Sequence, residues 1–110
     1  MKTSPVQPAD LSRSVISVPP FARNDDLSIN RAENRRLIRH LEAGGVRTLL
    51  YGGNANFYHV GTSEYPAVLD VIEQEAGADS WVIPSIGPDF GRMLDQARIL
   101  RGRGFPTAMA

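Results

Sequence analysis

Apolar and polar positions follow each other along the chain in a regular order. Short apolar or β-branched runs at 14–21, 46–51 and 81–83 are bounded by proline, glycine or asparagine, which predicts buried strands. Between these runs, apolar side chains recur at intervals of three and four, the spacing of an amphipathic helix. After the last such stretch, residues 105–110 are predicted to start a fourth strand.

The ends of the predicted helices carry recognisable signals. Asn30, with Glu33 three residues later, resembles a capping box that opens the first helix. The pair Gly44-Gly45 is expected to stop this helix, whose apolar positions include Leu37, Ile38 and Leu41. Either Thr62 or Ser63 is expected to cap the second helix, with Pro66 in its first turn, and Gly77 to end it.

The third helix has the most regular apolar pattern. Its first turn is expected to contain Pro88, and Gly104 is expected to end it. The apolar residues at helical spacing are Phe90, Met93, Leu94, Ala97 and Leu100. The whole order, strand-helix repeated three times and then a strand, predicts an α/β fold with parallel strands and right-handed crossovers.

This order alone does not distinguish an open doubly wound sheet from part of a barrel. Residues 105–110 would form a strand without a helix to cover it, although both faces of a parallel sheet are normally buried. We therefore expect residues 14–110 to be an incomplete domain. Residues 1–13 contain two prolines and no apolar stretch, and are expected to form a disordered tail.

Composition excludes several classes of function. The net charge of zero gives no reason to expect nucleic acid or an anionic membrane as a partner. The absence of cysteine excludes disulfides, thiolate zinc sites and a cysteine nucleophile, and fits the cytoplasmic location that we expect. No apolar run approaches the roughly 20 residues that span a bilayer. No glycine-rich nucleotide motif is present, and we expect no cofactor.

Several local motifs resemble the dihydrodipicolinate synthase / N-acetylneuraminate lyase family, from about Ser14 to Ala110. The run 15–21, Val-Ile-Ser-Val-Pro-Pro-Phe, resembles the first barrel strand with its Thr-Pro-Phe ending. The helix that ends at Gly44-Gly45 is similar to the family's first helix. Residues 49–56 fall on strand two with its Gly-Thr-Thr-Gly-Glu loop, and residues 82–87 fall on strand three. The resemblance implies the N-terminal half of a (β/α)₈ (TIM) barrel.

The resemblance also implies a substrate site. In the family, the loop after strand two binds the carboxylate of a 2-oxo acid through hydroxyls and backbone amides. The matching residues are Gly52, Gly53, Asn54, Ala55 and Asn56. Gly53 and Asn54 stand where the family has two threonines, so both hydroxyls are lost, while the backbone amides of the turn could still bind an anion. A tight turn containing two asparagines is an equally good interpretation.

The resemblance implies no catalytic residue within the 110 residues. The family's chemistry rests on a Schiff-base lysine and on tyrosines whose positions lie beyond Ala110. Eleven of the twelve basic residues are arginine, and the single lysine, Lys2, lies in the polar N-terminal segment. An imine-forming amine needs a desolvated site with a lowered pKa, so Lys2 is not expected to serve. Tyr51, Tyr58 and Tyr65 do not match the catalytic tyrosine.

Other titratable residues support simpler interpretations. His40 lies toward the end of the first predicted helix, and His59 lies in the loop after strand two. Neither has a partner at the spacing of a metal site or a hydrolytic triad, and no metal site is predicted. Phe57, Tyr58 and His59 could line a pocket or a subunit contact, although packing under the loop is commoner.

Two groups of arginines are not expected to bind a ligand. The helical stripe formed by Arg31, Arg35 and Arg39 is interleaved with acids and is expected to be solvated. Arg98, Arg101 and Arg103 are expected to complement the dipole of the third helix.

The function expected from the resemblance is that of a Schiff-base lyase or aldolase fragment. Its parent would act on a 2-oxo acid such as pyruvate, and these 110 residues would be inactive alone. One alternative is a non-catalytic half-barrel that self-associates through its open strand edges as a homo-oligomer. The other is a small flavodoxin-like α/β binding module.

Overall fold

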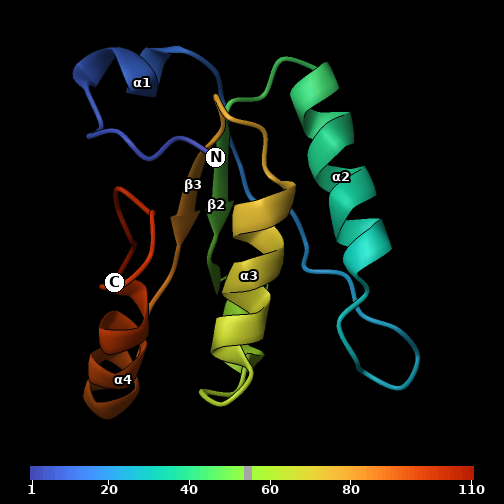
Figure 1. Cartoon of the computed structure of the whole chain (residues 1–110), viewed down its shortest axis with the longest axis vertical. Helices are drawn as coiled ribbons and strands as arrows, with labels where there is room; N and C mark the ends of the chain where they lie inside the picture. Colours follow the sequence, from blue (N-terminus) through green and yellow to red (C-terminus); the bar gives the residue numbers. More distant parts are fainter. Residues whose placement is uncertain (54–55) are drawn as a thin grey trace.

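The computed structural model describes residues 1–53 and 56–110, and its elements alternate along the chain (Figure 1). They are α1 (Pro8–Ser12), β1 (Ile16–Ser17), α2 (Arg31–Ala43), β2 (Thr48–Tyr51), the 3₁₀ helix η2 (Phe57–His59), α3 (Tyr65–Glu75), β3 (Trp81–Pro84) and α4 (Phe90–Leu100). No helix of this described part is long and apolar enough to cross a membrane.

The three strands form one parallel sheet in the order β1-β2-β3. Thr48 of β2 pairs with Ile16 on one side and with Trp81 on the other. The predicted parallel α/β arrangement is confirmed, and it is compatible with part of a TIM-barrel-like fold. The fourth strand predicted at 105–110 is not formed as a strand. Among the described residues, this segment makes one isolated parallel bridge, between Met109 and Ser85, just after β3.

Helices α2 and α3 cover one face of the sheet. Ile38 of α2, Leu69 of α3 and Leu49 and Val82 of the strands are all fully buried in one cluster. Figure 1 shows both helices on the same side of the strands. Complete burial of such a side chain contributes about 2 kcal/mol. This face therefore holds the core that fixes the strand ends and the loops that follow them.

The other face of the sheet is less well covered. Strand side chains alternate between the two faces, so Leu50 and Ile83 point away from the helices. Both remain partly exposed. At the sheet edge, Ile16 is 49% exposed and Val15, immediately before β1, is 72% exposed. The apolar surface is thus open at β1 and on the face opposite α2 and α3.

Helix α2, the first of the predicted helices, begins at the predicted Asn30 cap and ends before the predicted glycines. Only half of the predicted capping box forms, because the N–H of Asn30 donates to the carbonyl of Ala22 and not to the side chain of Glu33. The side chain of Asn30 accepts a hydrogen bond from the backbone N–H of Glu33 at 3.0 Å. At the other end, α2 stops at Ala43, and Gly45 adopts the left-handed conformation with φ +88°. A residue with a Cβ is disfavoured at this φ, which explains the glycine.

Two predicted helix starts are wrong. The N-cap of α3 is Glu64 and not Thr62 or Ser63, because the chain makes another turn before the helix begins. Glu64 gives the α3 amides no side-chain bond, since its carboxylate binds Arg23 instead. Pro88 lies just before α4, whose N-cap is Asp89.

Helix α4 exists where the periodicity predicts it, but its apolar stripe is not buried. Phe90 is 75% exposed and Leu94 is 41% exposed. The fully buried residue of the helix is Gln96, whose Oε1 accepts a hydrogen bond from the N–H of Gly87 at 2.8 Å. This helix is therefore tied to the loop after β3 by a polar contact.

The N-terminal segment has definite contacts where the sequence predicts a disordered tail. The N–H of Gln7 donates to the carboxylate of Asp10 at 2.7 Å at the start of α1. The N–H of Lys2 donates to the carbonyl of Ser80 at 2.8 Å. Capping and long-range backbone pairing stabilise this segment, and neither is visible in its polar composition.

Candidate functional site

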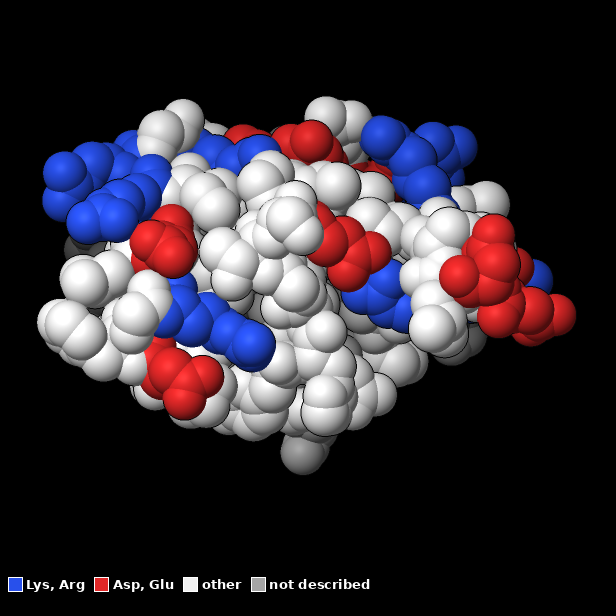
Figure 2. All heavy atoms as spheres, turned by 90° about the horizontal axis from the view of Figure 1, so that it is seen from below, with Lys and Arg blue, Asp and Glu red and all other residues white. Residues whose placement is uncertain are grey.

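The strands run toward one edge of the sheet, where the segments 18–30, 52–53, 56–64 and 85–89 follow them. In Figure 1 this edge is the lower one, and Figure 2 views the molecule from that side. Basic and acidic side chains alternate over this surface around an uncharged centre. Parallel α/β folds bind their ligands at the carboxyl ends of the strands.

The Gly52-to-Asn56 segment predicted to bind substrate lies directly after β2 on this edge. Asn54 and Ala55 lie outside the described residues. The carbonyl of Gly53 accepts a hydrogen bond from the N–H of Asn56 at 3.1 Å, and the carbonyl of Gly52 accepts one from Phe57 at 3.4 Å. Asn56 is left-handed, with φ +57°. These two bonds tie Asn56 and Phe57 back to the two glycines, a contact called here the Gly52-Gly53 turn, and its substrate role remains a prediction.

Both glycines of this turn are in close contact with other side chains. A Cβ on Gly52 would lie 2.6 Å from the terminal methyl of Met109. A Cβ on Gly53 would lie 2.8 Å from the ring of Tyr58. Real side-chain carbons do not approach this closely, so a larger residue at either position requires its neighbour to move. The packing of Met109 and Tyr58 thus explains the two glycines.

The aromatic residues around the turn divide into buried and exposed groups. Phe57 is 2% exposed and packs edge-on against Phe21 and Tyr65, with ring centroids about 6 Å apart. Tyr58 is 44% exposed. The expectation of packing under the loop is therefore correct for Phe57, while Tyr58 and His59 face outward.

A cavity of about 620 Å³ opens beside the turn. Its lining comes from the loop after β1 and from the loop after β2. These residues are Phe21, Arg23, Leu27, Asn56, His59, Val60 and Glu64. Two of the sequence candidates, Asn56 and His59, are thus brought to one cavity. Arg23 and Glu64, 41 positions apart, were missed because only the fold brings them together.

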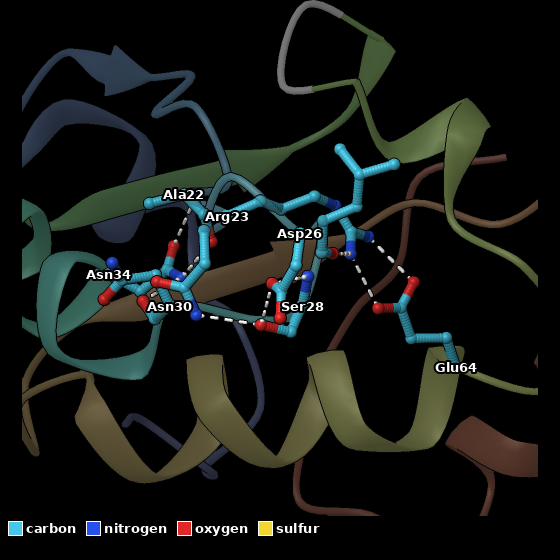
Figure 3. Close-up of polar contacts among 9 residues, drawn as sticks. Ala22, Arg23, Asp26, Ser28, Asn30, Asn34 and Glu64 are labelled. Carbon is cyan, nitrogen blue, oxygen red and sulfur yellow. Dashed lines mark hydrogen bonds and ion pairs between the residues drawn. The ribbon is translucent and has the colours of Figure 1, made fainter.

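Arg23 and Glu64 form a bidentate ion pair at this cavity (Figure 3). Nη1 of Arg23 donates to Oε1 of Glu64 at 2.6 Å, and Nη2 donates to Oε2 at 2.8 Å. These hydrogen bonds lower the pKa of Glu64 below its usual range. Nη1 also donates to the carbonyl of Leu27 at 2.8 Å. The pair therefore fastens the loop after β1 to the start of α3.

The base of that loop is held by the side chain of Asn34. Its Oδ1 accepts from the N–H of Ala22 at 2.9 Å, and its Nδ2 donates to the carbonyl of Ala22 at 2.9 Å. Asn34 is 1% exposed although it lies on a helix. Figure 3 shows how this amide and the Arg23–Glu64 pair fix the loop from two sides.

Several arginines that were predicted to be solvated or to face a helix dipole form ion pairs with acidic residues of α3 instead. Instead of a fully solvated face, Arg31 and Arg35 reach from α2 to Glu75 on α3, each through Nε at 2.6 Å. Arg103 lies beyond α4 and binds Asp70 at 2.6 Å, so it does not complement the helix dipole as expected. In the described part of the chain, no group of three His, Cys, Asp or Glu side chains could hold a metal ion.

Lys2 lies far from the candidate site. Its backbone N–H binds Ser80, immediately before β3, and its Nζ is 3.4 Å from the carboxylate of Asp10. These contacts belong to the edge where the strands begin, opposite the edge where the Gly52-Gly53 turn lies. The ammonium group of Lys2 therefore pairs with Asp10 at the edge of the sheet opposite the Gly52-Gly53 turn, and it does not contact the turn.

Comparison with known proteins supports the fold. The sequence matches no protein-family model and no curated protein. Among solved structures, the chain is similar to dihydrodipicolinate synthase from Rhodopseudomonas palustris, with a TM-score of 0.72 and 21% sequence identity. The similarity covers 84% of this chain but 31% of that enzyme, so the chain spans about a third of its neighbour's length. At this identity the similarity shows a dihydrodipicolinate-synthase-like fold alone.

Proposed function

We propose that this chain is the N-terminal part of a (β/α)₈ barrel of the dihydrodipicolinate synthase kind. In this proposal the parent protein forms a Schiff base with a 2-oxo acid such as pyruvate. The observation that carries the proposal is the position of the Gly52-Gly53 turn, at the carboxyl end of β2 in a fold similar to that enzyme. Binding of the substrate carboxylate by the amides of this turn is part of the proposal.

The 110 residues are proposed to be catalytically inactive by themselves. Imine formation condenses a neutral amine with the ketone of the substrate and releases water. The sequence has one lysine, and its Nζ is paired with Asp10 at the opposite edge of the sheet.

Two measurements test this proposal. Incubation with pyruvate and borohydride, followed by peptide mass spectrometry, is expected to give no stoichiometric adduct. A stoichiometric trapped adduct at any residue, Lys2 included, would contradict the proposed inactivity. Titration of ¹⁵N-labelled protein with millimolar pyruvate is expected to shift the amide signals of Gly52 and Gly53. Unchanged signals at saturating pyruvate would contradict the proposed substrate site.

A second candidate function, self-association of a non-catalytic half-barrel, is favoured by the open edge at β1. Ile16 of β1 is 49% exposed, and Val15 and Val18, which flank this strand, are 72% and 36% exposed. An exposed apolar edge strand is a site for pairing with another chain. Sedimentation velocity at two protein concentrations tests the idea together with thermal unfolding. A monomer whose melting temperature is independent of concentration would contradict it.

A further inference from the structure

A short hairpin in the loop after β1 forms one wall of the cavity of about 620 Å³. Arg23 and Ile29 pair as an antiparallel bridge, and inside this bridge the N–H of Asn24 donates to the carbonyl of Ser28 at 2.9 Å. Leu27 lies in the turn of the hairpin and lines the cavity. The volume of the cavity is within the range of about 300–1,000 Å³ that small-molecule sites occupy.

Leu27 is held on this wall in a strained conformation. Its backbone is left-handed, with φ +68°, a region that leucine rarely adopts. Its N–H donates to the carbonyl of Asn24 at 2.9 Å, and its carbonyl accepts from Nη1 of Arg23 at 2.8 Å. The side chain is nevertheless 71% exposed, so contacts within the described chain cover little of it. An apolar side chain that is fixed in this way offers preorganised surface for a ligand to cover.

The two charged groups of the cavity are already paired with each other. Each carboxylate oxygen of Glu64 accepts one hydrogen bond from the guanidinium of Arg23, at 2.6 and 2.8 Å. Cζ of Arg23 also lies 5.8 Å from the centre of the Phe21 ring, a cation–π contact. An anionic ligand would have to compete with Glu64 for the guanidinium, and a cationic ligand would have to compete with Arg23 for the carboxylate. The ion pair therefore favours an uncharged ligand.

The rest of the lining supplies apolar contacts and a polar ring. Val60 is 2% exposed and Phe21 is partly buried, so both present apolar surface to the same cavity as Leu27. His59 is exposed at this cavity, and the two nitrogens of its ring can donate or accept a hydrogen bond. Apolar walls with a few polar groups are typical of a small-molecule site.

We propose that this cavity binds a small uncharged ring compound with one polar edge. The apolar face of the ring packs against Leu27 and Phe21, and its polar edge forms a hydrogen bond with His59. A planar ring suits this lining because it carries an apolar face and a polar edge on one rigid body. The proposal does not depend on binding of a 2-oxo acid at the Gly52-Gly53 turn, since neither glycine lines the cavity.

Three probes that share a benzene ring test the proposal. Benzamide is neutral, benzoate is an anion and benzylamine is a cation near neutral pH. Each is titrated into protein with ¹³C-labelled leucine and valine methyl groups, and binding is measured from the signals of Leu27 and Val60. Benzamide is expected to shift both signals, with a Kd about tenfold lower than that of either charged probe. The absence of these shifts, or a charged probe that binds as tightly as benzamide, would overturn the proposal.

Side-chain replacements test the contacts. Leu27→Ala and His59→Ala each remove one contact from an exposed side chain, and each is expected to raise the Kd of benzamide about fivefold. Leu11→Ala is the matched control with an unchanged Kd, because Leu11 is 60% exposed on α1, outside the cavity. A Kd that is unchanged in both cavity variants, or raised equally in Leu11→Ala, would overturn the proposed site.

A fourth variant tests the charge argument. Glu64→Gln keeps the size of the side chain and removes the negative charge that Arg23 pairs with. Benzoate is therefore expected to bind this variant about tenfold more tightly than it binds wild type, while the Kd of benzamide changes little. Amide spectra of both proteins check that the fold is retained. A benzoate Kd equal to that of wild type would overturn the selection of uncharged ligands by the ion pair.

Discussion

Arg35 on α2 binds Glu75 on α3 through two hydrogen bonds, from Nε to Oε2 at 2.6 Å and from Nη2 to Oε1 at 3.2 Å. Glu75 is buried at the end of its helix, and Arg31 shares the same carboxylate. One acid therefore ties two neighbouring helices together at the end of α3. The two residues lie 40 positions apart in sequence.

Replacement of Glu75 by glutamine is expected to lower the free energy of unfolding by about 1 kcal/mol. The charged hydrogen bonds to both arginines are weakened, although the loss is limited because each guanidinium is about half exposed to water. Urea unfolding measures the change. Glu33→Gln is the control, since Glu33 pairs with Arg36 on an exposed surface and is expected to change little. Equal losses in the two variants would contradict the assigned role of Glu75.

The same pairs predict how stability depends on pH. Hydrogen bonds from Arg35 lower the pKa of Glu75, and those from Arg23 lower the pKa of Glu64. A lowered pKa in the folded state stabilises the protein above the ordinary glutamate value of 4.5. This stabilisation is lost as the pH falls below 4.5 through the folded-state pKa values. Urea midpoints between pH 6 and pH 3 should fall less steeply for Glu75→Gln than for wild type, and parallel curves would contradict the prediction.

These ion pairs could not be predicted from the sequence, unlike the order of strands and helices. The repeated strand–helix order, the Asn30 cap and the stop at Gly45 follow from local rules, and the structure confirms them. The ion pairs of Glu75 and Glu64 join residues at least 40 positions apart, so no local spacing reveals them. The same holds for the cavity, which two loops form only when the strands pair side by side.

Helix α4 shows the opposite case, in which a strong local pattern does not decide the packing. Its periodicity predicts the helix, yet Phe90 and Leu94 remain exposed. Periodicity says which residues share a helix face, and it does not say whether a partner covers that face. At the turn after β2, the sequence predicts the position of the loop but not the contact between Gly53 and Tyr58.

Two glycines are expected to respond to alanine in opposite directions. Gly45 has φ +88° and an open space around its Cα, so Gly45→Ala should lower stability by about 1 kcal/mol through backbone strain alone. Gly91 lies within α4, has no positive φ and also has open space. Gly91→Ala should raise stability by about 0.5 kcal/mol because alanine favours a helix. Thermal or urea unfolding tests the pair, and a change of the same sign in both would contradict the argument.

The hydroxyl of Tyr65 is expected to matter for stability, unlike that of Tyr58. Tyr65 is fully buried, and its O–H donates to the carbonyl of Ser85 at 2.9 Å. Tyr65→Phe leaves this carbonyl without its donor, which should cost about 1–2 kcal/mol. Tyr58→Phe removes a hydroxyl that faces solvent and should be nearly neutral in urea unfolding. A Tyr65→Phe variant as stable as wild type would show that water or another group replaces the bond.

The open edge at β1 leads to a prediction about assembly. Val15 is 72% exposed beside β1, and Lys at such a position blocks pairing between strand edges by requiring a charge to lose water. Val15→Lys is therefore expected to raise the dissociation constant of any self-association at least tenfold, measured by sedimentation equilibrium. Leu27→Lys is the matched control, because Leu27 is 71% exposed but lies in the loop after β1, away from the strand edge. If Leu27→Lys disrupts assembly as strongly as Val15→Lys, the contact does not run along β1. If neither variant changes it, the exposed strand edge plays no part in association.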